Sequence, residues 1–325
     1  MTTDPVNTPR TLEGPPAAEA AGGGRSLWSD AWRRLRRDWV AMLCLAVIFL
    51  YALVALGGTV YDLLAENYES IPTFGEMTDY EHRNEPPFQS WRYPLGTDWS
   101  GRCIMIKTLL AAKVSMTVGL MANAIAVPVG MVLGSLAGYY GGKTDSFIVW
   151  LFSTLASIPG IILLIAMKFA FEDVKVAGLD LTGIHGLYIA LGVISWVGTC
   201  RLVRAETMKV RELEYVVAAR AAGRHNFAIL LRHVLPNVSH LGIINFSIGF
   251  VGAVKAEVIL SYLGLGVETG TPSWGNMISA ARFDLVLGRW WEITAAVTAM
   301  FFLVLALNIF GDRLRDALDP RLRGI

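Results

Sequence analysis

The sequence has few charged residues and few cysteines. Asp, Glu, Lys and Arg make up 17% of the 325 residues, whereas a soluble domain usually carries about 25%. The three cysteines, Cys44, Cys103 and Cys200, stand far apart, and no closely spaced Cys or His group accompanies them. This spacing argues against a metal or redox centre. The net charge of +1 gives no indication of a nucleic-acid-binding surface.

The chain also lacks the motifs that would give it a catalytic or nucleotide-binding centre of its own. Residues 137–144 read A-G-Y-Y-G-G-K-T, which misses the first glycine of the phosphate-binding pattern G-x-x-x-x-G-K-[ST] and lies between two apolar stretches. Thr271 stands where a G-x-S-x-G turn around Ser273 would need glycine, and H-E-x-x-H does not occur. We therefore expect no enzymatic activity, cofactor or metal in this chain.

Hydrophobic residues, by contrast, make up 54% of the chain and gather in six long stretches. A membrane-spanning helix needs about 20 mostly apolar residues, because each adds about 1.5 Å across a hydrocarbon core about 30 Å thick. We therefore predict an all-α, polytopic membrane protein with six transmembrane helices. The six stretches that meet or approach the required length are 41–60, 114–138, 146–167, 181–200, 234–254 and 293–311.

The distribution of Lys and Arg predicts the orientation in the membrane. With both termini in the cytoplasm, the inner segments carry most of the Lys and Arg residues. The first apolar run lies too deep in the chain for a cleavable signal peptide, and it is long enough to remain as an anchor. The expected organisation is a disordered cytoplasmic tail over 1–25, an interfacial amphipathic helix over 26–39, a first transmembrane helix over 40–60, an extracytoplasmic segment over 61–112, a five-helix core over 113–311 and a cytoplasmic tail over 312–325.

Two stretches are expected at the outer surface. Residues 61–112 are too polar to enter the bilayer, and they form either a contact for an external protein or a passive loop. Residues 265–291 are polar but contain Trp274, Phe283 and two further tryptophans. We expect a short helix or a re-entrant piece lying at the outer surface.

The predicted inner loop, part of the segment 201–236, contains two short helices. Residues 211–222 are rich in alanine, which favours a helix, and Gly223 stands where a left-handed C-terminal cap is needed. Residues 226–234 place apolar side chains on one face, and Pro236 suits the first turn of the next span. A loop that merely joined two spans would not need to be helical, to present small side chains on one face and to be basic at once.

This loop resembles the cytoplasmic signature of ATP-binding-cassette (ABC) importer permeases, E-A-A-x3-G-x9-I-x-L-P. Val217 replaces the glutamate of the signature, and His233 replaces its isoleucine. The residues of the loop resemble those of the dipeptide/oligopeptide/nickel branch in particular. The residues that match the signature are Ala218, Ala219, Gly223, Leu235 and Pro236.

Further stretches between about residue 93 and the C-terminus are similar to the same branch. The closing stretch and the extra N-terminal span are more similar to the second, C-type permease of such systems than to the first. These stretches read P-L-G-T-D at 94–98 with G-R at 101–102, A-G-Y-Y-G-G at 137–142, S-Y-L-G-L-G at 261–266, P-S-W-G at 272–275 and D-R-L-R-D-A-L-D-P-R at 312–321.

The resemblance implies a type I importer permease fold and import of di- or oligopeptides by alternating access. It also implies a homologous second permease, two cytoplasmic ATPase subunits that bind ATP and Mg, and an extracytoplasmic substrate-binding protein. In the family, the loop docks into a cleft of the ATPase. The residues that the resemblance and the loop's charges assign to this coupling are Glu214, Tyr215, Ala218, Ala219, Arg220, Gly223, Arg224, Leu235 and Pro236.

Two ionisable residues lie in or near the outer half of the fifth span. Lys255 and Glu257 are two positions apart, so they point to different faces of a helix and should not pair directly. Charges in a membrane are costly and usually face a cavity or a partner. We expect at least one of them to face the translocation path or the second permease, with Ser261 one turn further along. Alternatively, Lys255 extends its ammonium group to the outer interface.

Other functions stay open on the residues alone. Close relatives import nickel chelates or sugars by the same mechanism. No residue in the sequence indicates which substrate side chains the protein recognises. A secondary transporter or channel would work without an ATPase, which the inner loop disfavours. A membrane-embedded enzyme would need a catalytic pair that we do not find in the sequence.

Overall fold

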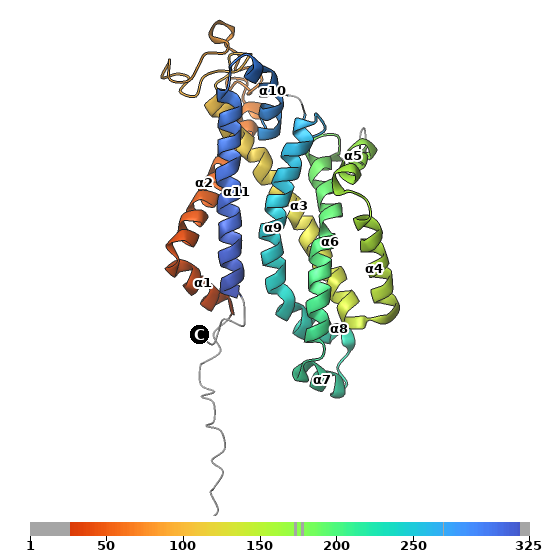
Figure 1. Cartoon of the computed structure of the whole chain (residues 1–325). Coiled ribbons are helices and arrows are strands. Elements are labelled where there is room, and N and C mark those ends of the chain that lie inside the picture. Colours follow the sequence, from red (N-terminus) through yellow and green to blue (C-terminus); the bar gives the residue numbers. More distant parts are fainter. Residues whose placement is uncertain (1–26, 172–173, 177–178, 269, 319–325) are drawn as a thin grey trace, which may run out of the picture.

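The computed structural model describes residues 27–171, 174–176, 179–268 and 270–318. The expected tail over 1–25 and the last seven residues of 312–325 lie outside this part of the chain. Most of the described residues are helical, which confirms the all-α prediction (Figure 1). Two strands of two residues each, β1 (Lys175–Val176) and β2 (Leu179–Asp180), form an antiparallel pair.

Among the described residues, five helices are long and apolar enough to cross a membrane. Four of them contain a predicted stretch in full, and the fourth predicted stretch, 181–200, is covered from Ile184 onward. The five helices are α2 (Trp39–Asn67), α3 (Ile104–Tyr140), α6 (Ile184–Val210), the continuous run Asn226–Tyr262 that ends in α9 (Leu235–Tyr262), and α11 (Trp291–Leu318).

The predicted third span, 146–167, is not one straight helix. It is divided into α4 (Gly142–Ala156) and α5 (Gly160–Ala170), which meet at an angle of 90°. Pro159 cannot donate a backbone hydrogen bond and restricts the residue before it, so the helix breaks there. At about 1.5 Å per residue, neither piece alone is long enough to cross about 30 Å of hydrocarbon. The part of the chain that the structure describes therefore has five long spans, or six if the bent pair counts as one.

The flanking helices extend into both ends of the segment expected over 61–112. α2 runs on to Asn67 and α3 begins at Ile104, so the largely non-helical part is 68–103, with one short 3-10 turn, η1 (Tyr80–His82). The charges in the flanks do not end the helices, because Lys113 of α3 pairs with Asp62 of α2.

The two ends of the bundle carry different elements (Figure 1). One end, called the α7 end below, holds α7 (Glu214–Ala221), α8 (Asn226–Ile229), α1 (Leu27–Arg37) and the last turns of α11. The opposite end, the α10 end, holds the segment 68–103 and the short helix α10 (Trp274–Val286), which the sequence predicted within 265–291.

The core is built around α3, which packs on α6 over much of its length. Three glycines of α3 lie directly against the α6 backbone: a Cβ atom added at Gly130, Gly134 or Gly138 would come within 2.6–2.7 Å of an α6 carbonyl oxygen. The small-residue spacing of these glycines is therefore a packing feature. On its other side, α6 holds α4 through Arg204, whose Nη2 donates to Asp145 Oδ2 at 2.7 Å.

The helix α1 packs one of its sides on the bundle. Leu35 and Ala31 are buried, while Trp32 is exposed. The buried side faces α11, and Arg313 of α11 pairs with Asp38 at 3.4 Å. α1 therefore closes the end of α11 as well as presenting an exposed basic face.

Candidate coupling and translocation sites

The helix α7 ends in a fully formed left-handed cap. Gly223 has a φ of +75°, the region that L side chains avoid. The Gly223 N–H donates to the Arg220 carbonyl at 3.0 Å, and the Arg224 N–H donates to the Ala219 carbonyl at 3.2 Å. These two bonds are the pair of a Schellman motif. The cap predicted at Gly223 is confirmed, although the helix begins at Glu214 and not at Arg211.

A small apolar cluster fixes α7 and α8 to the membrane helices. Val216 of α7 and Ile229 of α8 are fully buried, and both pack near Tyr139 of α3. The Tyr139 hydroxyl also hydrogen-bonds Asn226 Oδ1 at 3.1 Å, and the Arg220 guanidinium lies 5.7 Å from the Tyr139 ring centre. The loop is thus a rigid part of the bundle and not a free connection.

The outward side of α7 is exposed and partly apolar. Leu213 and Val217 are 47% and 46% exposed, and Ala218 is exposed beside them. Ala219 is half-buried against the apolar cluster, so only one of the two signature alanines is presented outward. Of the other predicted coupling residues, the structure places Glu214, Tyr215, Arg220 and Arg224 at exposed positions around the same two turns.

A continuous helix leads from this loop into the membrane. α8 passes through five residues of π-helix, η2 (Leu230–Val234), into α9, and the Leu235 N–H bonds the Leu230 carbonyl five residues back. Pro236 in the first turn of α9 has no N–H to donate, which fits a locally widened turn. Leu235 is half-buried and Pro236 exposed, and Asn237 Nδ2 donates to the Tyr215 hydroxyl at 2.9 Å. Movement of α7 would therefore pass directly to α9.

Two of the three residues predicted for the translocation path lie inside the subunit. Glu257 and Ser261 are 0% and 1% exposed. The Ser261 hydroxyl donates to Glu257 Oε1 at 2.8 Å, and the Ser115 hydroxyl of α3 donates to Glu257 Oε2 at 3.2 Å. Burial among hydroxyl donors makes Glu257 a bridge between α9 and α3, and in this structure neither residue reaches an open surface.

Lys255 occupies the opposite side of α9. It is exposed, and it lies on a strip with Ile248, Gly252, Ile259 and Tyr262, all of which are exposed. Residues at these spacings lie within about 40° of one line at ~100° per residue. Glu257 lies about 200° away from Lys255 on the same scale. The prediction that the two charges face different sides is therefore confirmed.

Sequence reasoning missed a buried ionic cluster near the α10 end. Lys107 of α3 donates to Asp98 Oδ2 at 2.9 Å and to Glu292 Oε1 of α11 at 2.6 Å. The Arg102 Nε also donates to Asp98, at 3.1 Å. Burial by itself would raise the pKa of Asp98, but Lys107 and Arg102 outweigh it and the pKa lies below its usual range. Asp98 falls in one of the stretches similar to the family, which was the available signal.

A second polar group holds the segment 68–103 together at its surface. His82 Nδ1 lies 3.0 Å from Asp79 Oδ2, and the Tyr93 hydroxyl donates to the same oxygen at 2.9 Å. The hydrogen bond with His82 lowers the pKa of Asp79, and the same bond raises the pKa of His82. The segment is therefore a folded layer over the α10 end.

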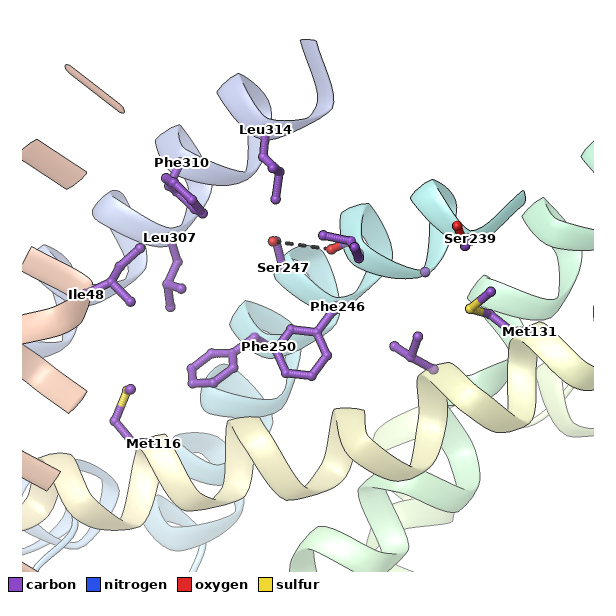
Figure 2. Close-up of a pocket in the computed structure, with 13 residues that line it drawn as sticks. Ile48, Met116, Met131, Ser239, Phe246, Ser247, Phe250, Leu307, Phe310 and Leu314 are labelled. Atoms are coloured by element: carbon purple, nitrogen blue, oxygen red, sulfur yellow. Dashed lines mark hydrogen bonds between the residues drawn. The ribbon is translucent and has the colours of Figure 1, made fainter. Parts of the chain in front are cut away.

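A cavity of ≈ 560 Å³ lies beside α9 on the face toward α11. Figure 2 shows Phe246 and Phe250 of α9, Leu307 of α11 and Met116 of α3 around it. Its lining is almost wholly apolar. The two serines in it, Ser239 and Ser247, donate their hydroxyl groups to backbone carbonyls of α9. Such a lining offers few partners to a charged, polar substrate. Its size alone does not make it the substrate site.

The long apolar helices indicate a protein embedded in a membrane. A capped helical loop lies at one end of the bundle and a folded layer at the other, as a membrane transport subunit with partners on both sides would need. The chain belongs to the family described as binding-protein-dependent transport system inner membrane component, whose model matches residues 130–324. A second model, the N-terminal transmembrane domain of oligopeptide transport permease C, matches residues 26–87. The prediction of a multi-span permease subunit and not an enzyme is confirmed.

Relatives with related names align along most of the chain. A glutathione transport system permease protein of Pectobacterium atrosepticum is 34% identical over 302 residues, covering 92% of this chain and 93% of the relative. An oligopeptide transport system permease protein of Haemophilus influenzae is 33% identical, covering 92% and 90%. A dipeptide transport system permease protein of Bacillus subtilis is 30% identical, covering 92% and 87%. The resemblance to the peptide permeases is therefore confirmed.

One chain of a solved structure, an inward-facing methionine ABC transporter, also aligns with the fold. It is 19% identical, with a TM-score of 0.49, over 66% of this chain and 93% of that chain.

Proposed function

We propose that this subunit imports di- or oligopeptides by alternating access, and that α7 carries the contact with a cytoplasmic ATPase. The observation that carries the proposal is a rigid helix with an exposed apolar face that leads without interruption into a membrane helix. The family match and the names of the relatives support the same machinery.

The coupling step follows from the geometry of the loop. Leu213, Val217 and Ala218 give α7 a compact surface that fits a cleft on a partner protein. The cap at Gly223 and the buried Val216 keep this surface fixed to the bundle. When two ATPases close on ATP and Mg, the docked helix is displaced as a unit and tilts α9. The nucleotide and the metal are bound by the ATPase subunits.

The remaining partners complete the pathway. A homologous second permease pairs with this chain in a heterodimer, and the translocation path runs between the two. A substrate-binding protein delivers peptide at the α10 end, where the layer 68–103 and α10 supply the outer surface. The α7 end then lies in the cytoplasm, as the Lys and Arg distribution predicts. Of the predicted path residues, Lys255 is the one that faces outward from the subunit.

The test introduces bulk and charge on α7. The variant Ala218→Arg, at an exposed position, should abolish co-purification with the ATPases and the peptide-stimulated ATPase activity of the reconstituted importer. The matched control Thr144→Arg lies at an exposed position of α4 at the same end and should leave both unchanged. Normal coupling in Ala218→Arg, or peptide movement by the two permeases without ATPases, would overturn the proposal. The second result would favour an ATP-independent transporter.

A further inference from the structure

We propose that Lys255 binds the carboxylate of the peptide during translocation, and that Arg282 of α10 receives the same group first at the outer surface. This inference rests on the proposed import of peptides. It names the chemical group of the substrate that binds to the exposed strip on α9. This strip was defined above by Ile248, Gly252, Lys255, Ile259 and Tyr262.

The first argument is the cost of the charge. An ammonium group in a membrane helix costs about 2.5–3.5 kcal/mol near the centre of the bilayer. Glu257 avoids exposure by burial among serines, but Lys255 is exposed and, among the described residues, has no carboxylate within ion-pair distance. A side chain of this kind is retained where an aqueous path or an anion compensates for it.

The second argument is the position of a second cation on the same line. The Arg282 guanidinium lies 5.9 Å from the ring centre of Tyr262, and Tyr262 ends the strip. Lys255 lies seven residues before Tyr262, which is about 10 Å along the helix. Arg282 is exposed and forms no ion pair with any residue in the described ranges. An anion that enters from the α10 end would meet Arg282 first and Lys255 about two turns deeper.

The third argument is space. A Cβ atom added at Gly252 would meet nothing within 4 Å, so the strip is open one turn from Lys255. Two cations at different depths beside open space fit a mobile anion that moves along the strip. A packed helix of the second permease would instead need two fixed acids at matching depths. The anion that every peptide with a free C-terminus carries is its carboxylate, which Lys and Arg bind by charge-assisted hydrogen bonds.

The transport test uses the full importer in proteoliposomes with its binding protein. Uptake of tri-alanine is compared with uptake of tri-alanine amide. We expect Lys255→Met to lower the ratio of free to amidated peptide uptake about tenfold or more, because one charge-assisted hydrogen bond is lost. Lys255→Arg should restore the ratio. The control Lys143→Met, at an exposed lysine of the α7 end, should leave it unchanged. Discrimination by the binding protein is common to all variants and cancels.

A second measurement does not depend on the binding protein. In the purified complex, Gly252→Cys reports access to the strip through its rate of modification by a small thiol reagent, and the three native cysteines are buried. Tri-alanine should slow this modification, tri-alanine amide should not, and the double variant Gly252→Cys/Lys255→Met should lose the protection.

Three results separate the possibilities. An unchanged ratio and unchanged protection in Lys255→Met would overturn the inference and leave a lysine that extends to the interface. Loss of co-purification with the second permease in Lys255→Met would replace it with an ion pair between subunits. Failure of the wild-type complex to import tri-alanine at all would instead count against the proposed function.

Discussion

At the scale of single residues, the charges of this chain divide into buried and exposed groups with different roles. Asp98, Lys107 and Glu292 compensate one another inside the protein, and Glu257 is held by hydroxyl groups. Lys255 has no such compensation among the described residues. Lys255 and Glu257 are two residues apart in the sequence. Only the packing of the helices shows that Glu257 is buried and that Lys255 is exposed.

The buried cluster yields a prediction for stability. Asp98→Asn should lower the free energy of unfolding by about 2–3 kcal/mol, because Lys107 keeps Glu292 but loses one carboxylate. The measurement is thermal unfolding in detergent. The control Arg92→Gln breaks a mostly exposed pair, Arg92 with Asp79, and should change stability by less than about 0.5 kcal/mol. Equal losses in the two variants would contradict this account.

The pH dependence of the same effect has a definite sign. The folded pKa of Asp98 lies below the ordinary value of 3.8. Its contribution is therefore fully present above about pH 3.8 and is lost as the pH falls through the lowered pKa. The difference between wild type and Asp98→Asn should stay constant from pH 8 to pH 5 and shrink only in strong acid.

At the scale of helices, the contact between α3 and α6 depends on the spacing of small residues along α3. Glycines four residues apart allow the two backbones to approach. The break between α4 and α5 has a similarly local cause in Pro159. The angle of 90° does not follow from the proline, because the packing of α4 on α6 through Arg204 and Asp145 also sets it.

The α3–α6 contact can be tested with a matched pair of glycines. Gly134→Ala places a Cβ atom 2.6 Å from the Cys200 carbonyl oxygen and should destabilise the protein by about 1–3 kcal/mol. Gly198→Ala, in α6, meets nothing within 4 Å and should be neutral or slightly stabilising, because alanine favours a helix. Melting temperatures of the two variants in detergent provide the measurement. A stable Gly134→Ala protein would show that the helices separate at little cost.

At the scale of the whole molecule, the two ends of the bundle are chemically distinct, and the proposed mechanism requires that they face different compartments. The α7 end carries α7 and the basic face of α1, and the α10 end carries the folded segment 68–103 (Figure 1). In the proposed orientation, a cytoplasmic ATPase would reach only the α7 end, and a soluble receptor outside the cell would reach only the α10 end.

The orientation can be measured directly in the bacterial inner membrane. Ala222→Cys at the α7 end should react with a membrane-impermeant maleimide in inverted vesicles but not in spheroplasts. Trp91→Cys, at a fully exposed position of the segment 68–103, should react in spheroplasts only. The native cysteines are buried and should give little background. The reverse pattern would remove the basis for α7 as the contact with the ATPase.

The sequence by itself determined the class of the molecule: long uncharged stretches favour helices in a membrane, and Gly223 after an alanine-rich run favours the end of a helix because glycine adopts a left-handed backbone at little cost. These features depend on local chemistry, which the sequence contains. The tertiary structure alone decided that Leu35 is buried against α11, that Glu257 and Ser261 are enclosed, and that Lys107 joins Asp98 to Glu292. Those outcomes depend on which faces of distant helices meet, and in the last case the partners lie up to 185 positions apart.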